Sequence, residues 1–260
     1  MEKIAIIGGT GVYDPSILGD VKEVGVSTPY GMMNAVTGNY QGFDVVFMNR
    51  HGKGHSVPPH MINYRANIWG LKELGVTKIM ATAAVGSLNL DMAPGHFVFP
   101  DQYLEFTKAR QCTFFDGGDM GVVHTDMTEP YCPHLRKGLT QAAAAIAHQA
   151  HDGGVYVCTE GPRFETPAEI KMYRHMGGDL VGMTSFPEVA LAREVGMCYA
   201  TIAMVTNYAA GVSPTHLTHE EVLEVMAENS ATIKSLLLAA IPLIAGNGDC
   251  QCRGTAGPVK

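Results

Sequence analysis

The sequence predicts an α/β domain built from one continuous chain. Short apolar runs alternate with amphipathic segments, which is typical of a sheet covered by helices. The chain has 260 residues, 46% of them hydrophobic, and single α/β domains often reach about 200–250 residues. Polar residues gather where the predicted strands end, at the edge where open α/β sheets bind ligands.

The predicted elements follow one another in a regular order. The strand runs are short, rich in Ile, Val, Phe or Met, and end at glycine or a polar residue. Seven such runs lie at 3–9, 44–50, 76–86, 96–103, 154–161, 179–185 and 198–207. The segments between them carry apolar residues at helical spacing. They predict helices at 61–75, 133–150, 166–177 and 187–196, and a long last helix at about 218–244.

Two stretches differ from this pattern. Residues 104–132 are polar, aromatic and without period, and loops of that length usually serve as lids, binding loops or interfaces. Residues 246–260 carry glycines and two cysteines and also lack periodicity. We therefore expect a single domain of residues 1–245 and a flexible tail of residues 246–260.

Composition excludes several classes of protein. The net charge of −7 argues against a nucleic-acid surface. No run of about 18 apolar residues could span a membrane, and the start MEKIAIIGG does not resemble a signal peptide. Six cysteines suit the reducing cytoplasm. Cys250 and Cys252 form a CQC pair, either in an exposed tail or as a redox-sensitive pair. Two thiols alone cannot complete a zinc site, so no metal site is predicted.

The first strand ends in GGTG, which is open to three interpretations. Glycine N–H groups and the Thr10 hydroxyl could hold a phosphate, and a plain turn would explain the same residues. A dinucleotide site needs G-x-G-x-x-G opening a helix, which GGTGVYDP does not match. We favour the single phosphate.

Other strand ends carry side chains suited to the same anion. Arg50 presents a planar fork that matches phosphate, and His51 beside it can donate as well, although a surface turn remains the alternative. With Thr10 and the hydroxyl of Thr184, these residues could form an anion cradle.

Two further strand ends could contact a flat heterocycle. Phe164 and Glu165 in EGPRFETPAE offer an aromatic face beside a carboxylate; alternatively Phe164 is core and Glu165 favours the following helix electrostatically. Asn207 ends an apolar strand, where an amide is disfavoured. Either it caps the strand against its own backbone, or a ligand uses it.

These motifs resemble the trimeric purine nucleoside phosphorylase and methylthioadenosine phosphorylase family over residues 3–244. The resemblance rests on GGTG, RHG, NYRANIW, AAVGSL, TEPYCP, EGPRFET and VGMTSFPEVALARE. It implies a nucleoside phosphorylase fold with a mixed, barrel-like central sheet flanked by helices. It also implies a homotrimer and phosphorolysis of an N-glycosidic bond without metal or organic cofactor.

The family's contacts fall on particular residues of this chain. Phosphate contacts fall on Thr10, Arg50, His51, Ala83, Ala84 and Thr184. Familiar members have threonine or asparagine at Ala83, so one donor is missing, and Thr82 is a candidate to compensate. Met183 matches the residue under the sugar, Phe164 the residue against the base, and His55 is expected near the sugar. His124 matches a position that reaches a neighbouring subunit's sugar pocket.

Three positions bear on the choice of substrate. Adenosine-type members carry aspartates where this chain has Asn207 and Ala209. The amide of Asn207 can donate a hydrogen bond from its NH2 to O6 of a 6-oxopurine and accept one from N7–H. Glu165 can accept from N1–H, which only 6-oxopurines present. His219 matches a histidine that binds the 5′-hydroxyl, unless it is a solvent-exposed residue of the helix.

The sequence therefore predicts a cytoplasmic enzyme that cleaves inosine and guanosine with phosphate. Asn207, Glu165 and His51 are the expected catalytic residues. Alternatives are a methylthioinosine phosphorylase, a methylthioadenosine phosphorylase, and a nucleoside-binding protein without turnover because of Ala83. A nicotinamide oxidoreductase is weaker still.

Overall fold

The computed structural model describes residues 2–9, 17–213, 219–246 and 248–257, apart from the side chains of Lys53, His219 and Glu221. Its centre is an eleven-stranded sheet of parallel and antiparallel strands. The strands are β1 (Lys3–Gly8), β2 (Gly19–Thr28), β3 (Gly31–Tyr40), β4 (Phe43–Asn49), β5 (Val76–Ser87), β6 (Phe97–Phe99), β7 (Gln102–Phe106), β8 (Ala150–Asp152), β9 (Val155–Thr159), β10 (Leu180–Gly182) and β11 (Cys198–Tyr208).

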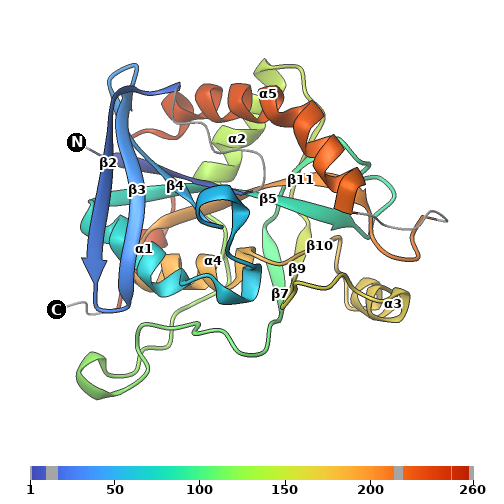
Figure 1. Ribbon diagram of the computed structural model, residues 1–260, viewed down its shortest axis with the longest axis horizontal. Helices are drawn as coiled ribbons and strands as arrows, with labels where there is room; N and C mark the ends of the chain where they lie inside the picture. Colours follow the sequence, from blue (N-terminus) through green and yellow to red (C-terminus); the bar gives the residue numbers. More distant parts are fainter. Residues whose placement is uncertain (1, 10–16, 214–218, 247, 258–260) are drawn as a thin grey trace.

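Helices cover both faces of this sheet, which confirms the predicted fold class. The α-helices are α1 (Tyr64–Glu73), α2 (Pro133–Ala145), α3 (Pro167–His175), α4 (Ser185–Glu194) and α5 (His219–Ile244). Helices α2 and α5 lie above β5 in Figure 1, whereas α1 and α4 lie below it. One hydrophobic cluster fills the space under α2 and α5, and a second fills the space between the sheet and α1 and α4. No helix in the described ranges is long and apolar enough to cross a membrane.

Most predicted elements are present, and the exceptions have local causes. The run 96–103 is two strands, β6 and β7, because Pro100 has no N–H to give to a ladder. The sequence pattern gave no indication of β2 and β3, an antiparallel pair at the sheet's edge. Strand β2 is mostly exposed and contains glycine, so it lacks the apolar run by which the buried strands were recognised. The helix predicted at 133–150 is too long: α2 ends at Ala145, and Ala150 is already the first residue of β8.

Strand β5 is the branch point of the sheet. Residues Val76–Ala81 pair with β1 on one edge, and Gly86 and Ser87 pair with β10 on the same edge. Strand β11 follows the other edge from Lys78 to Ser87. Among the described residues, positions 82–85 therefore have no ladder partner on the first edge. This gap in the sheet is where the cavity described below opens.

The C-terminal segment makes specific contacts with the domain, although much of it is exposed. Cys252 is fully buried, and residues Cys252–Thr255 form a short 3-10 helix against the domain. The Glu2 carboxylate accepts hydrogen bonds from the Gly246 N–H and the Arg253 guanidinium. Cysteine and polar side chains therefore tie this segment to the domain, although Gln251, Arg253, Gly254 and Ala256 are exposed; the division after residue 245 stays a prediction.

Candidate active site

The structure brings ten of the predicted site residues to one cavity of about 390 Å³. They come from the end of β4, the middle of β5, the loops after β9 and β10, and the end of β11. The ten residues are Arg50, His51, Ala83, Ala84, Phe164, Glu165, Met183, Thr184, Asn207 and Ala209. His55 lines the same cavity.

Beside the gap in the sheet, β5 presents unpaired backbone groups to this cavity. In a parallel ladder, alternate residues point their N–H and C=O groups to the same edge. The Thr82 carbonyl accepts a hydrogen bond from Arg50 Nη1, so it faces the edge vacated by β1. The N–H of Ala84, two residues on, faces that edge as well. A backbone donor is therefore available beside Ala83, which has no side-chain donor.

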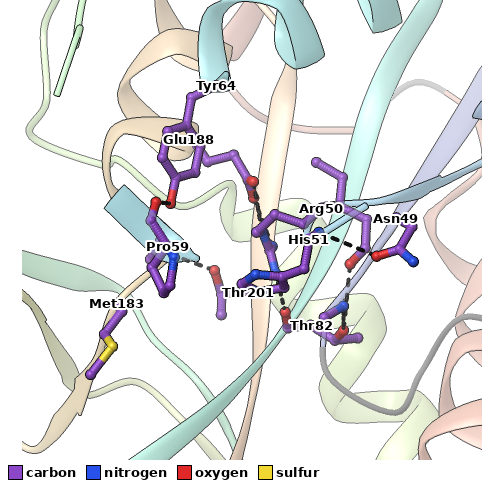
Figure 2. A network of polar contacts seen from close by, with 12 residues as sticks. Asn49, Arg50, His51, Pro59, Tyr64, Thr82, Met183, Glu188 and Thr201 are labelled. Carbon is purple, nitrogen blue, oxygen red and sulfur yellow. Dashed lines mark hydrogen bonds and ion pairs between the residues drawn. The ribbon is translucent and has the colours of Figure 1, made fainter. Parts of the chain in front are cut away.

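Arg50 is held rigidly at the cavity wall by a buried carboxylate. Its Nε and Nη2 donate to the two oxygens of Glu188 at 2.7 and 2.8 Å, and Nη1 donates to the Thr82 carbonyl at 2.8 Å (Figure 2). Tyr199 Oη donates to Glu188 at 2.8 Å. Burial alone would lower the pKa of Arg50, but the Glu188 carboxylate raises it above its usual value. Two of the five guanidinium N–H groups remain for a ligand.

His51 differs from the donor that the sequence suggested. Its Nδ1 lies 2.9 Å from the Val57 carbonyl oxygen, which can only accept, so Nδ1 carries the proton. Burial lowers the pKa of His51 to about 4, and the charge of Arg50 adds to this effect. The neutral ring is therefore an acceptor at Nε2 at neutral pH. Nε2 can accept a hydrogen bond from a hydroxyl group, such as that of monohydrogen phosphate.

Gly9 and Thr82 close the cavity beside Arg50. A Cβ on Gly9 would lie 2.7 Å from the Thr82 carbonyl oxygen, so only glycine fits at this position. The Thr82 hydroxyl accepts from the Gly9 N–H at 2.8 Å and donates to the Ile7 carbonyl at 3.4 Å. The suggestion that Thr82 compensates for Ala83 is thus wrong, since its hydroxyl is used inside the protein.

A β-bulge turns the Asn207 side chain into the cavity. The pairing of β11 with β5 shifts register between Val205 and Asn207, and a bulge re-aims the side chains that follow it. The Asn207 Oδ1 accepts from Thr206 Oγ1 at 2.8 Å, and Nδ2 donates to the Tyr208 carbonyl at 2.9 Å. These bonds fix the amide while leaving one N–H and one lone pair for a ligand.

The loop before α3 presents Glu165 and Phe164. Thr166 and Glu169 form a capping box that starts α3, so Glu165 is not the residue that caps this helix. The Glu165 carboxylate instead accepts from Thr159 Oγ1 at 2.7 Å. Burial raises the pKa of Glu165, although the bond from Thr159 lowers it. Phe164 is 41% exposed at the cavity rim.

Met183 and Thr184 lie between β10 and α4. A Cβ on Gly161, which has a φ of +66°, would lie 2.5 Å from the Met183 sulfur. The positive φ favours glycine at position 161, and a side chain there would also displace the Met183 side chain. Thr184 is buried and precedes α4 without capping it through its side chain.

Arg110 joins these two loops and was missed by sequence reasoning. Its guanidinium donates to the carbonyls of Thr159 and Glu160 on one side and of Met183 and Phe186 on the other, at 2.6–3.0 Å. Arg110 belongs to the stretch 104–132, whose lack of periodicity gave no sign of such a role.

Other functional residues could also not be assigned from the sequence alone. Glu188 stands within the quoted block VGMTSFPEVALARE, but only the fold shows that it faces Arg50. Val222 of α5 and Thr206 of β11 line the cavity too. An apolar helix residue such as Val222 gives no signal that distinguishes a cavity wall from the core.

Of the other predicted site residues, His124 does not line the cavity, and Thr10 and the His219 side chain lie outside the described part of the chain. His124 is exposed in the segment that extends away from the sheet at the bottom of Figure 1. His219 is the first residue of α5.

The chain is similar over nearly its full length to known proteins. The model of the phosphorylase superfamily matches residues 3–242. The chain is 57% identical to a probable 6-oxopurine nucleoside phosphorylase of Moorella thermoacetica, over 99% of both chains. It is 55% identical to the 6-oxopurine nucleoside phosphorylase of Pyrococcus furiosus, over 97% of both. The methylthioadenosine phosphorylase of Schistosoma mansoni, solved with adenine, superposes with a TM-score of 0.90 at 38% identity, covering 95% of this chain and 93% of that one.

Proposed function

The chain belongs to the phosphorylase superfamily, and from this premise we propose that it is a purine nucleoside phosphorylase acting on 6-oxopurine nucleosides. It cleaves inosine and guanosine with inorganic phosphate to the free base and ribose 1-phosphate. The observation that carries this proposal is the placement of an amide and a carboxylate, Asn207 and Glu165, on the wall of the cavity that also holds Arg50.

Phosphate binds at the end of the cavity formed by Arg50, His51 and Thr184. The two remaining N–H groups of Arg50, the Ala84 N–H and the Thr184 hydroxyl donate to its oxygens. His51 accepts the remaining phosphate hydroxyl at Nε2. Thr10, which follows Gly9, is proposed as a further donor.

The purine binds against Phe164, with Asn207 and Glu165 at its edge. The free N–H of Asn207 donates to O6, and its oxygen accepts from N7–H. Glu165 in its ionised form accepts from N1–H and, in guanine, from N2–H. An adenine base has no proton on N1 and presents a donor at position 6, so it mismatches both side chains.

Cleavage then needs positioning and electrostatics but no covalent intermediate with the protein. Glycosidic bonds break through oxocarbenium-like transition states, and the negative phosphate next to the sugar stabilises this cation. Phosphate forms the new bond to C1′ as the bond from C1′ to N9 breaks, and the electron pair passes to the purine. Asn207 and Glu165 stabilise the leaving base, and Met183 lies beside the sugar.

We further propose that the enzyme works as a homotrimer in the cytoplasm. His124 is exposed on a segment that also exposes Val122, and it does not line its own cavity. In the trimer it reaches the sugar site of the neighbouring subunit. The cysteines, which form no disulfide among the described residues, suit a reducing compartment.

A second candidate is an S-methyl-5′-thioinosine phosphorylase with the same base site. The observation that favours it is Val222, which is buried and lines the cavity three residues after His219. An apolar wall there suits a methylthio group, whereas a histidine at 219 suits a 5′-hydroxyl. A methylthioadenosine phosphorylase is disfavoured by Asn207, Ala209 and Glu165.

Phosphate dependence is the direct test of the proposed reaction. Hypoxanthine release from inosine should need inorganic phosphate and yield an equal amount of ribose 1-phosphate. Release without phosphate would make the protein a hydrolase, and binding of inosine without any product would make it a nucleoside-binding protein.

A further inference from the structure

Four cysteines that are distant in the sequence meet at the end of the sheet opposite the branch with β10. Cys132, Cys198, Cys250 and Cys252 place their sulfur atoms within 4.8 Å of one another. Three of them are buried and Cys250 is partly buried. None of the four belongs to the lining of the cavity.

Several contacts outside the cluster hold these cysteines together. The Cys132 N–H donates to the Tyr199 carbonyl at 2.8 Å, which sets the start of α2 beside Cys198, the first residue of β11. Thr255 Oγ1 donates to the Arg193 carbonyl at 3.0 Å, and this contact returns the CQC segment to the domain. The fold thus holds all three parts of the chain together without a disulfide bond among these four cysteines.

The spacing of the sulfur atoms fits a tetrahedral metal site. A zinc–thiolate bond of about 2.3 Å places the sulfurs of a tetrahedron about 3.8 Å apart. The sulfurs of Cys198 and Cys250 are 3.5 Å apart, which is near this edge length and far beyond a disulfide bond of about 2.05 Å. Because all four sulfurs are mutually close, the arrangement is a single cluster rather than two separate pairs.

The start of α2 lies at the cluster. Cys132 occupies the N-cap position of α2, a helix of 13 residues. The positive end of a helix stabilises a negative sulfur. Four soft sulfur ligands select zinc or iron over magnesium or calcium.

We propose that Cys132, Cys198, Cys250 and Cys252 form a structural Zn²⁺ site that fastens the C-terminal segment to α2 and β11. Each thiol releases its proton as it binds, so zinc uptake frees four protons and needs no oxidant or reductant. The CQC pair supplies two ligands, and the start of α2 and the start of β11 supply the others. This site is separate from the cavity and does not depend on the proposed reaction.

Metal content of the wild-type protein tests the proposal directly. The full chain is purified with a thiol reductant and without chelators, and its metals are measured by inductively coupled plasma mass spectrometry. We expect one zinc per chain, released by a mercurial reagent and replaceable by Co²⁺ with the absorption of a tetrahedral cobalt thiolate. A metal-free protein, whether its cysteines are free thiols or disulfides by intact mass, overturns the proposal. Iron in place of zinc overturns the assignment to zinc.

Matched cysteine variants locate the site. Cys252→Ser should lower the affinity for zinc, measured by competition with a chelator, by at least ~10-fold, because loss of a residue that only orients a metal ligand already costs about 10–100-fold. Cys112→Ser removes an exposed cysteine outside the cluster and should keep the wild-type zinc affinity. A folded Cys252→Ser protein with unchanged zinc affinity would contradict the assignment. Inosine cleavage by the wild-type protein is measured in parallel. A protein that binds zinc but does not cleave inosine would contradict the proposed reaction alone. A protein that cleaves inosine but contains no zinc would contradict the metal site alone.

Discussion

Replacing Asn207 by aspartate is the sharpest single perturbation of the proposed base site. The substitution keeps the size of the side chain but exchanges the Nδ2 donor for an acceptor. Nδ2 donates to the Tyr208 carbonyl at 2.9 Å, so the new oxygen would face another oxygen. The bond from Thr206 to Oδ1 can remain. The change therefore falls mainly on the donor that we assign to O6 of the purine.

The expected magnitude follows from the burial of this group. Asn207 is 7% exposed, and a buried polar group left without its partner costs about 1–3 kcal/mol. Since about 1.4 kcal/mol is a factor of ten in rate, kcat/KM for inosine should fall about 5- to 150-fold. Activity on adenosine should rise, because a carboxylate can accept from N6–H.

The assay is the ratio of kcat/KM for inosine to that for adenosine at saturating phosphate. This ratio is independent of the fraction of folded enzyme, so a loss of stability does not disturb it. Thr206→Val is the matched control: it removes the hydroxyl that binds Oδ1, leaves the amide donor in place, and should keep the ratio. An unchanged ratio in Asn207→Asp would refute the assignment of Asn207 to the base.

Further predictions concern Glu165, Glu188 and His51. Glu165→Gln should lower kcat/KM for guanosine and inosine by at least ~10-fold, because a hydrogen bond to a charged group is worth about 1.5–3 kcal/mol; an unaffected guanosine rate would remove Glu165 from the site. Since burial raises the pKa of Glu165, wild-type kcat/KM for inosine should fall as the pH drops toward that pKa, and this acid limb should be absent from the pH profile of Glu165→Gln. Glu188→Gln should destabilise the fold by up to about 3–5 kcal/mol, as for other buried ion pairs, and raise the KM for phosphate more than that for inosine. Tyr199→Phe removes one hydrogen bond to the same carboxylate and should cost about 1.5–3 kcal/mol. Equal changes in both KM values would contradict a role of Glu188 through Arg50. The pKa of His51 is about 4 in the folded chain and about 6.5 in the unfolded chain. Between these pH values the unfolded chain binds a proton at His51 and the folded chain does not. It therefore contributes a loss of stability of about 3 kcal/mol as the pH falls from 6.5 to 4, with none above 6.5; a ring that titrates near 6.5 by NMR would show this reasoning to be wrong.

The strand ends could be predicted from the sequence because each leaves a local mark. A short apolar run that stops at a polar residue identifies Arg50, Thr184 and Asn207. The parallel arrangement of β4, β1, β5 and β11 brings the ends at Arg50 and Asn207 together, whereas Thr184 follows β10, which is antiparallel to β5. EGPRFET can also be explained from neighbouring residues: Gly161 has a positive φ, and Thr166 caps the start of α3. These are properties of a few neighbouring residues.

What the sequence could not supply depends on contacts across the chain. The partnership of Arg50 with Glu188 spans 138 positions, and the role of Arg110 in clamping two loops has no local pattern. The tautomer of His51 is set by the Val57 carbonyl, which no side-chain motif reports. The four cysteines meet only because α2, β11 and the C-terminal segment converge.

Specificity for 6-oxopurine nucleosides is the central claim, and it is tested most directly by comparing the phosphorolysis of inosine, guanosine, methylthioinosine and methylthioadenosine. Release of free base is measured for each nucleoside with the same enzyme and the same phosphate concentration. The proposed site predicts that inosine and guanosine are cleaved fastest. If methylthioinosine were preferred, the base site would stand and the 5′ assignment of His219 would be wrong. Preference for methylthioadenosine would contradict the roles of Asn207 and Glu165 together.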